Sequence, residues 1–132
     1  MQLERPLDFY AVTDHGEFLG NVEAMSDPAQ PLYEHPAAAA FQNAETLDER
    51  RAAFAGIRPY LAPGSYESFL DRNVVRAAWQ DIIGAAERHN RPGEFTTFIG
   101  YEYTSRPDNQ NLHRNVIFRA RHRTCRLPGS TP

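Results

Sequence analysis

A regular run of apolar residues within 66–90 constrains the fold of this chain more than any other feature. The apolar residues recur at steps of three and four, which places them on one stripe of an α-helix. They are Phe69, Leu70, Val74, Val75, Ala78, Trp79, Ile82, Ile83 and Ala86. Pro92 and Gly93 follow, and proline cannot continue a helix while glycine tolerates the exit geometry. We predict a long helix near 66–90 with Trp79 in the core, and a second helix over 37–56 from its alanine, glutamate and arginine content.

Three segments around the long helix have the composition of β-strands. Residues 7–13 are apolar almost throughout, and we predict that they form a buried strand. The other two strands are predicted over 95–101 and 115–119, which are rich in aromatic and β-branched residues. The joint between them shows no helical period, whereas a parallel crossover usually needs a helix. We therefore expect an antiparallel hairpin here and an α/β fold for the whole chain.

Length and charge limit the class of protein. A chain of 132 residues can bury a core of its own, so one domain is the default expectation. The 14 basic and 17 acidic residues give a net charge of −3, which argues against a nucleic-acid or anionic-membrane partner. No apolar run reaches the roughly 18 residues of a membrane helix, and residues 1–10 lack the apolar stretch of a signal peptide. The chain as given is therefore predicted to be cytoplasmic.

Side chains that can bind a metal ion lie where the predicted strands end or begin. Asp14 and His15 follow the first strand, Glu102 closes the second, and His113 precedes the third. If the first two strands are parallel, their carboxyl ends share one edge of the sheet, and the hairpin brings His113 to the same edge. Imidazole and carboxylate together suit zinc, manganese or iron. We expect His15, Glu102 and His113 to share one pocket, although a histidine at a strand end is often only structural.

A second carboxylate gives an alternative interpretation of the same region. Glu17 lies two residues beyond His15, and with His113 it completes the two-histidine, one-carboxylate set of non-haem iron oxygenases. Those enzymes generally carry the set on an all-β barrel, whereas the long helix favours α/β. Three other histidines are expected to be structural or solvent-facing, namely His35, His89 and His122.

The segments LDFYAVTDHGEFLG, PGEFTTFIGYEYTS and NLHRNVIFR resemble a known family. They are similar to the bacterial family catalogued as domain of unknown function 3604, a set of proteins like the PHP (polymerase and histidinol phosphatase) metal-dependent hydrolases. The matching stretches extend from Leu3 to Arg119. The resemblance implies a distorted seven-stranded α/β barrel, of which this chain is a part. It also implies two or three divalent metal ions, zinc, manganese or iron, for phosphoester hydrolysis.

The resemblance also implies roles for individual residues. His15 matches the ligand of the family's Thr-Asp-His motif, Glu102 the carboxylate of its Gly-x-Glu motif, and His113 the histidine before the following strand. Asp14 matches the aspartate of the first motif and is expected to act beside His15 in catalysis, as a secondary ligand or an orienting group. Metal-activated water would attack a small ester or phosphoester, and Arg114 is a candidate for neutralising the anionic substrate.

The chain also departs from the family pattern. The family's upstream Gly-Asp-x-His-x-His segment and a later Pro-His-Asn histidine are both absent. The expectation is therefore a single incomplete PHP-like domain over 1–132, an inactive internal fragment, and the sequence does not determine whether Met1 and Pro132 are the native termini. An export signal could then precede Met1 in the full protein. A non-catalytic vestigial or binding module is the remaining alternative.

Overall fold

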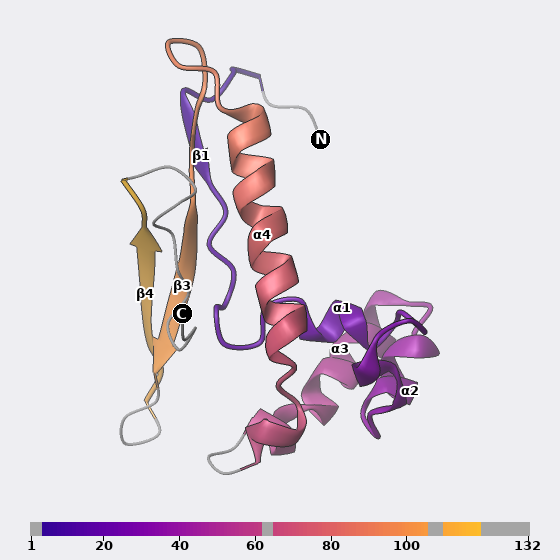
Figure 1. Cartoon of the computed structure of the whole chain (residues 1–132). Coiled ribbons are helices and arrows are strands. Elements are labelled where there is room, and N and C mark those ends of the chain that lie inside the picture. Colours follow the sequence, from indigo (N-terminus) through magenta and orange to yellow (C-terminus); the bar gives the residue numbers. More distant parts are fainter. Residues whose placement is uncertain (1–3, 62–64, 106–109, 120–132) are drawn as a thin grey trace. The chain divides into compact units, whose positions relative to one another are not determined.

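The computed structural model describes residues 4–61, 65–105 and 110–119 (Figure 1). The chain divides into two compact units. Unit 1 comprises residues 1–17 and 78–132, and unit 2 comprises residues 18–77. Helices and two small sheets make the protein mixed α/β, and the described residues close no barrel. Within the described ranges, no helix combines the length and the apolar character that crossing a bilayer requires.

Two pairs of strands form the sheets of unit 1. Strand β1 (Phe9–Ala11) pairs in parallel with β2 (Thr96–Phe98). Strand β3 (Gly100–Ser105) pairs in antiparallel fashion with β4 (Leu112–Ile117). Both the parallel pairing and the hairpin predicted from the sequence are confirmed.

The bounds of the strands differ from those predicted. The range 95–101 is divided between β2 and β3, and the hairpin strand predicted over 115–119 already begins at Leu112. The reason is that Tyr103 and Thr104 have strong β-propensity and extend the ladder beyond the predicted end of the strand. Glu102 and His113 therefore lie within paired strands and not where the hairpin loop begins.

The prediction of a buried first strand was wrong. β1 has only three residues, and Phe9 and Tyr10 are 66% and 52% exposed. Among the described residues, β1 has a paired neighbour on one side only, and Phe9 meets Phe98 edge-to-face at 6.2 Å between ring centroids. An apolar run shows that a segment can be buried, but the covering surface must come from elsewhere in the fold.

The long helix is confirmed as α4 (Arg72–His89). It begins later than predicted because the Asp71 carboxylate accepts the backbone N–H groups of Asn73 and Val74, which fixes the first turn. The residues before it form a separate 3₁₀ turn, η3 (Tyr66–Ser68).

The part of α4 in unit 1 carries that unit's core. Trp79 and Ile83 are 3% and 1% exposed, which confirms the prediction for Trp79. The indole packs edge-on to Tyr101 at 6.0 Å and against Phe118 at 5.9 Å. Side chains alternate between the two faces of a strand, so Tyr101 and its neighbour Glu102 point to opposite faces of β3. The apolar packing on one face leaves the other face to polar residues.

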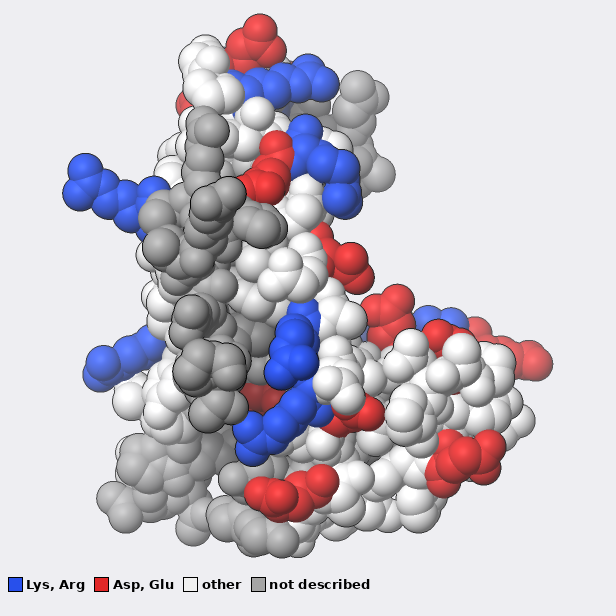
Figure 2. Space-filling model, in the orientation of Figure 1, with Lys and Arg blue, Asp and Glu red and all other residues white. Residues whose placement is uncertain are grey.

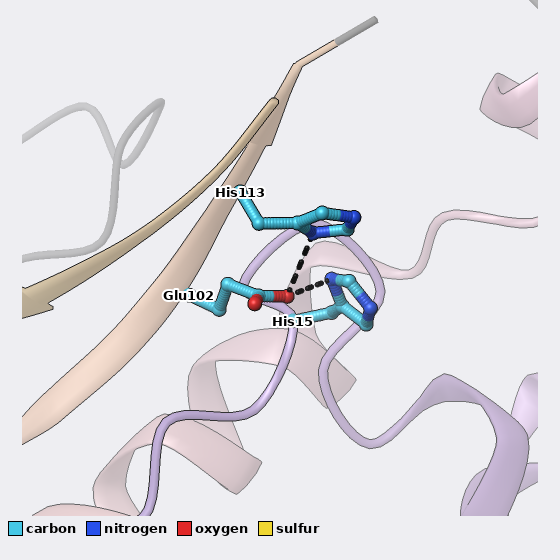
Figure 3. A group of neighbouring side chains, drawn as sticks. All are labelled: His15, Glu102 and His113. Atoms are coloured by element: carbon cyan, nitrogen blue, oxygen red, sulfur yellow. Dashed lines mark hydrogen bonds and ion pairs between the residues drawn. The ribbon is translucent and has the colours of Figure 1, made fainter. Parts of the chain in front are cut away.

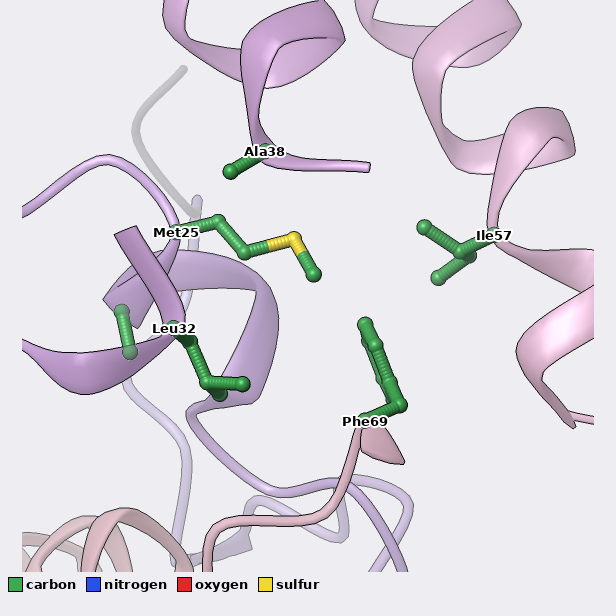
Figure 4. Close-up of a cluster of buried hydrophobic side chains, with 6 residues drawn as sticks. Met25, Leu32, Ala38, Ile57 and Phe69 are labelled. Carbon is green, nitrogen blue, oxygen red and sulfur yellow. The ribbon is translucent and has the colours of Figure 1, made fainter. Parts of the chain in front are cut away.

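Unit 2 is built from short helices around an apolar cluster (Figure 4). Besides η3 and the start of α4, its elements are α1 (Asn21–Ala24), η1 (Pro31–Glu34), α2 (Ala38–Gln42), α3 (Leu47–Gly56) and η2 (Arg58–Leu61). The cluster consists of Ala24, Met25, Leu32, Ala38, Ile57 and Phe69. Beside it, the buried Asn21 amide donates to the carbonyl oxygen of Phe69 at 2.6 Å, which ties α1 to the segment before α4.

The single helix predicted over 37–56 is in fact two helices. Thr46 and Glu49 form a capping box, in which the Thr46 hydroxyl accepts the Glu49 N–H and the Glu49 carboxylate accepts the Thr46 N–H. This reciprocal pair satisfies the free donors at a helix start. It therefore begins α3 as a new helix after α2 has ended.

Charged side chains of both signs are interspersed over the face of the molecule drawn in Figure 2. All 14 basic residues of the chain are arginine. On the part of this face that the structure describes, the arginines do not gather into a single patch.

Candidate metal centre

The segment after β1 continues alongside β3 and positions His15. The Glu102 N–H donates to the Asp14 carbonyl at 2.8 Å, and the Gly16 N–H donates to the Glu102 carbonyl at 3.0 Å. These two bonds make His15 and Glu102 an isolated parallel bridge. Residues paired in this way project to the same face, so the backbone sets the two side chains next to each other.

The β3–β4 ladder brings in His113. Glu102 lies opposite Asn115, and Thr104 lies opposite His113. Glu102 and His113 are therefore diagonal neighbours on one face, because the hairpin stem extends beyond the predicted ends of the two strands. The N–H and C=O of Glu102 point toward the 14–16 segment, so these two pairs are of the closely spaced, non-hydrogen-bonded type.

Three donor side chains from three separate segments meet on this face (Figure 3). The Oε2 atom of Glu102 is 2.7 Å from His15 Nδ1 and 3.1 Å from His113 Nδ1. One potential ligand atom from each residue lies within 4.8 Å of the other two. The side chains of His15 and His113 are 58% and 42% exposed, and that of Glu102 is 22% exposed. The cluster is thus open to solvent from the histidine side.

A fourth group in the cluster, Thr104, was not predicted from the sequence. Its Oγ1 is 2.8 Å from His15 Nδ1, 3.1 Å from His113 Nδ1 and 3.4 Å from Glu102 Oε2. The signal that could have found it is the period of a strand, because residues two apart share a face and Thr104 is two residues beyond Glu102.

The other predicted site residues lie outside this group. Asp14 contributes its backbone carbonyl, and it precedes His15 in an extended segment, where neighbouring side chains alternate in direction. Arg114 pairs with Tyr103 in the ladder and so leaves β4 on the face opposite to His113. The Glu17 carboxylate accepts the Thr104 N–H at 3.1 Å. The catalytic role of Asp14 and the substrate-binding role of Arg114 stay predictions.

The geometry of the cluster fits a small divalent ion. Ligand atoms at about 2.0–2.2 Å from a tetrahedral ion are separated by roughly 3.3 Å. The separations of 2.7 and 3.1 Å from Glu102 to the two imidazoles are hydrogen-bond lengths, and both would have to widen to roughly 3.3 Å to admit an ion. Two imidazole nitrogens and a carboxylate oxygen form a donor set used for zinc, manganese and iron.

His35 shows what a structural histidine looks like in the same chain. Its Nδ1 accepts the Ala37 N–H at 3.1 Å, and its ring lies edge-on to Tyr60 and Phe69 at 4.8 and 5.7 Å. Burial lowers the pKa of His35 below its usual value of 6.5. The structural role predicted for His35 agrees with these contacts. His89 is exposed at the end of α4, and His122 lies outside the described residues.

Comparison with protein families gives a match over almost the whole chain. The family described as "Protein of unknown function (DUF3604)" matches residues 1–130, which includes both units and every residue of the cluster. No curated protein and no solved structure matches the chain.

Proposed function

The chain belongs to the DUF3604 family, and on that premise we propose that it supplies part of the divalent-metal site of a PHP-like hydrolase acting on phosphoesters. The observation that carries the proposal is the convergence of His15, Glu102 and His113 from three separate segments. The motifs around these residues resemble those of the PHP-like hydrolases. The parallel pair β1–β2 is also the kind of pairing from which the distorted barrel of that group is built.

The cluster suits this chemistry through its donors and its access to solvent. His15 and His113 would hold the ion through Nδ1, and Glu102 through Oε2. A bound zinc, manganese or iron ion would lower the pKa of a coordinated water from its high value in bulk solvent toward about 7, which would supply hydroxide for hydrolysis. Because both imidazoles are partly exposed, an ion and a small ester or phosphoester can reach them without a rearrangement of the strands.

The test is metal binding by matched histidine variants. Calorimetric titration of the metal-free chain with Zn²⁺ or Mn²⁺ should show binding that His113→Ala weakens by at least about tenfold. His89→Ala should bind as the wild type does, because His89 lies at the exposed end of α4. Circular dichroism of both variants checks that the fold is kept. Equal loss in the two variants, or no binding by the wild-type chain, would contradict the proposal.

One observation favours a second candidate, an iron-dependent oxygenase. The cluster contains two histidines and one carboxylate, the composition of the non-haem iron site, with Glu102 in place of the Glu17 expected from the sequence. The helix α4 beside the strands weighs against it, because that site is usually carried on an all-β barrel. Fe²⁺-dependent oxygen uptake without hydrolysis of a nitrophenyl phosphate would favour the oxygenase, and hydrolysis without oxygen uptake would favour the hydrolase. Metal binding without either reaction is the expected result both for an inactive fragment of a hydrolase and for a binding module.

A further inference from the structure

The Thr104 hydroxyl lies within hydrogen-bonding distance of all three donor atoms of the cluster. It is within 3.4 Å of the carboxylate oxygen and within 3.1 Å of each imidazole nitrogen. Together with the two carboxylate–imidazole separations, five short contacts join four polar atoms. Their lengths, 2.7 to 3.4 Å, approach the roughly 3.3 Å between ligand atoms on one tetrahedral ion.

Hydrogen atoms are too few to make all five contacts simple hydrogen bonds. Each imidazole Nδ1 carries at most one proton, the hydroxyl carries one, and an ionised carboxylate carries none. At most three of the five contacts can therefore contain a hydrogen atom of their own. In the other two contacts, lone pairs face each other. A cation among the four atoms would satisfy all of these lone pairs at once.

The backbone of Thr104 is held in place by Glu17. The bridge between His15 and Glu102 ends at Gly16, where the chain turns away from β3. The next backbone donor on this edge of β3 is the Thr104 N–H. It donates to the Glu17 carboxylate at 3.1 Å, and this carboxylate takes the place that a backbone carbonyl would have if the 14–16 segment continued along β3. The hydroxyl is therefore presented from a fixed strand and not from a free loop.

We propose that Thr104 is a fourth donor of this metal site and that its hydroxyl favours Mn²⁺ relative to Zn²⁺. The inference rests on the proposed function, because it presupposes that His15, Glu102 and His113 hold an ion. A neutral hydroxyl oxygen is a hard donor of the kind that suits magnesium and manganese, whereas zinc sites draw on imidazole, thiolate and carboxylate. The two imidazoles bind both Mn²⁺ and Zn²⁺. The hydroxyl therefore raises the affinity for Mn²⁺ relative to the affinity for Zn²⁺.

The experiment compares two metals and three variants of the full chain. Mn²⁺ binding is followed by electron paramagnetic resonance, and Zn²⁺ binding by competition with a chelating dye. Thr104→Val, which keeps the side-chain shape and removes the hydroxyl, should weaken Mn²⁺ binding about tenfold and Zn²⁺ binding by no more than about twofold. Thr104→Ser should stay close to the wild type for both ions. Ser105→Ala is the control, because Ser105 is the next residue of β3 and points to the opposite face.

The outcomes separate this inference from the proposed function. If the wild-type chain binds both ions and Thr104→Val weakens the binding of both by the same factor, the hydroxyl does not discriminate between Mn²⁺ and Zn²⁺. The inference is then overturned. If Thr104→Val binds both ions as wild type does, the hydroxyl is not a donor. A wild-type chain that binds neither ion would instead remove the metal site itself, and with it the premise of this inference.

Discussion

Histidine has opposite surroundings in the two units of this protein. In unit 1, His15 and His113 turn their Nδ1 atoms toward Glu102 on a face open to solvent. In unit 2, the His35 ring is enclosed by two aromatic rings, and its Nδ1 accepts a backbone N–H from two residues away. The sequence shows only a histidine in each case. Its role follows from whether its neighbours are a carboxylate and other polar groups or the aromatic rings beside a buried core.

The same contrast extends from single residues to whole units. The buried cluster of unit 2 is made of apolar side chains, so its substitutions should act on the free energy of unfolding. The polar face of unit 1 is partly exposed, so substitutions there should act on ion affinity first. Four experiments test this division between the two units.

The largest effect is expected in the core of unit 2. Phe69 is fully buried, and Phe69→Ala should lower the free energy of unfolding by about 3–5 kcal/mol through lost burial and the cavity left behind. Phe54 is 54% exposed, and Phe54→Ala should cost less than about 1 kcal/mol. Urea unfolding measures both values. Comparable costs for the two variants would show that the cluster is not the stabilising core.

The second effect concerns the carboxylate of unit 1. Glu102→Gln keeps the shape of the side chain and removes its charge, and it should weaken metal binding by at least about tenfold, or about 1.4 kcal/mol. Glu94→Gln, in the turn before β2, is a matched control that should change nothing. Calorimetric titration reports the affinities, and urea unfolding should give similar midpoints for all three proteins. A large loss of stability in Glu102→Gln would place Glu102 among the structural residues instead.

The third effect is the start of α3. Removing the cap with Thr46→Ala should lower the free energy of unfolding by about 1 kcal/mol at neutral pH. Hydrogen bonds from the Thr46 backbone, the Thr46 side chain and the Glu45 backbone hold the pKa of Glu49 below its usual 4.5. The stabilising contribution of Glu49 is therefore present above pH 4.5 and is lost as the pH falls through its lowered folded-state pKa. The penalty of Thr46→Ala should shrink over that acid range, and a penalty independent of pH would contradict this account of the cap.

The smallest effect is the pH dependence due to His35. Its folded-state pKa lies below 6.5 because of burial, so the unfolded chain binds a proton more readily as the medium becomes acidic. Stability should therefore be complete above pH 6.5 and decrease as the pH falls below it. Urea midpoints measured from pH 8 to pH 5 should show this slope in the wild type and in His89→Gln, and a weaker slope in His35→Gln. The same slope in all three proteins would assign it to other groups.

Much of the fold follows from local sequence patterns. The parallel pairing of β1 and β2 follows from a strand, helix, strand order, and the hairpin follows from a joint without helical period. Even the break between α2 and α3 has a signal, because Thr46 and Glu49 have the spacing of a capping box. The capping-box spacing is a specific signal, but the helix-forming composition of 37–56 led to the prediction of one continuous helix.

The details of the site follow from register, which local patterns do not determine. Whether Glu102 faces His113 or Asn115 depends on where the hairpin loop begins, and β-propensity does not fix that residue. Thr104 enters the cluster only because the ladder extends as far as Ser105. The exposure of Phe9 was unpredictable for a related reason, since it depends on which other segments cover β1.

The bond from Glu17 to the Thr104 N–H has a practical consequence for experiments in solution. This amide proton has its partner on the 14–17 segment and not on β4, so its hydrogen bond breaks when that segment leaves β3. Its hydrogen-exchange rate therefore measures how often the site segment opens, independently of the hairpin. Comparing this one amide with the ladder amides of β4, with and without added ions, would give the free energy that an ion contributes to ordering the site.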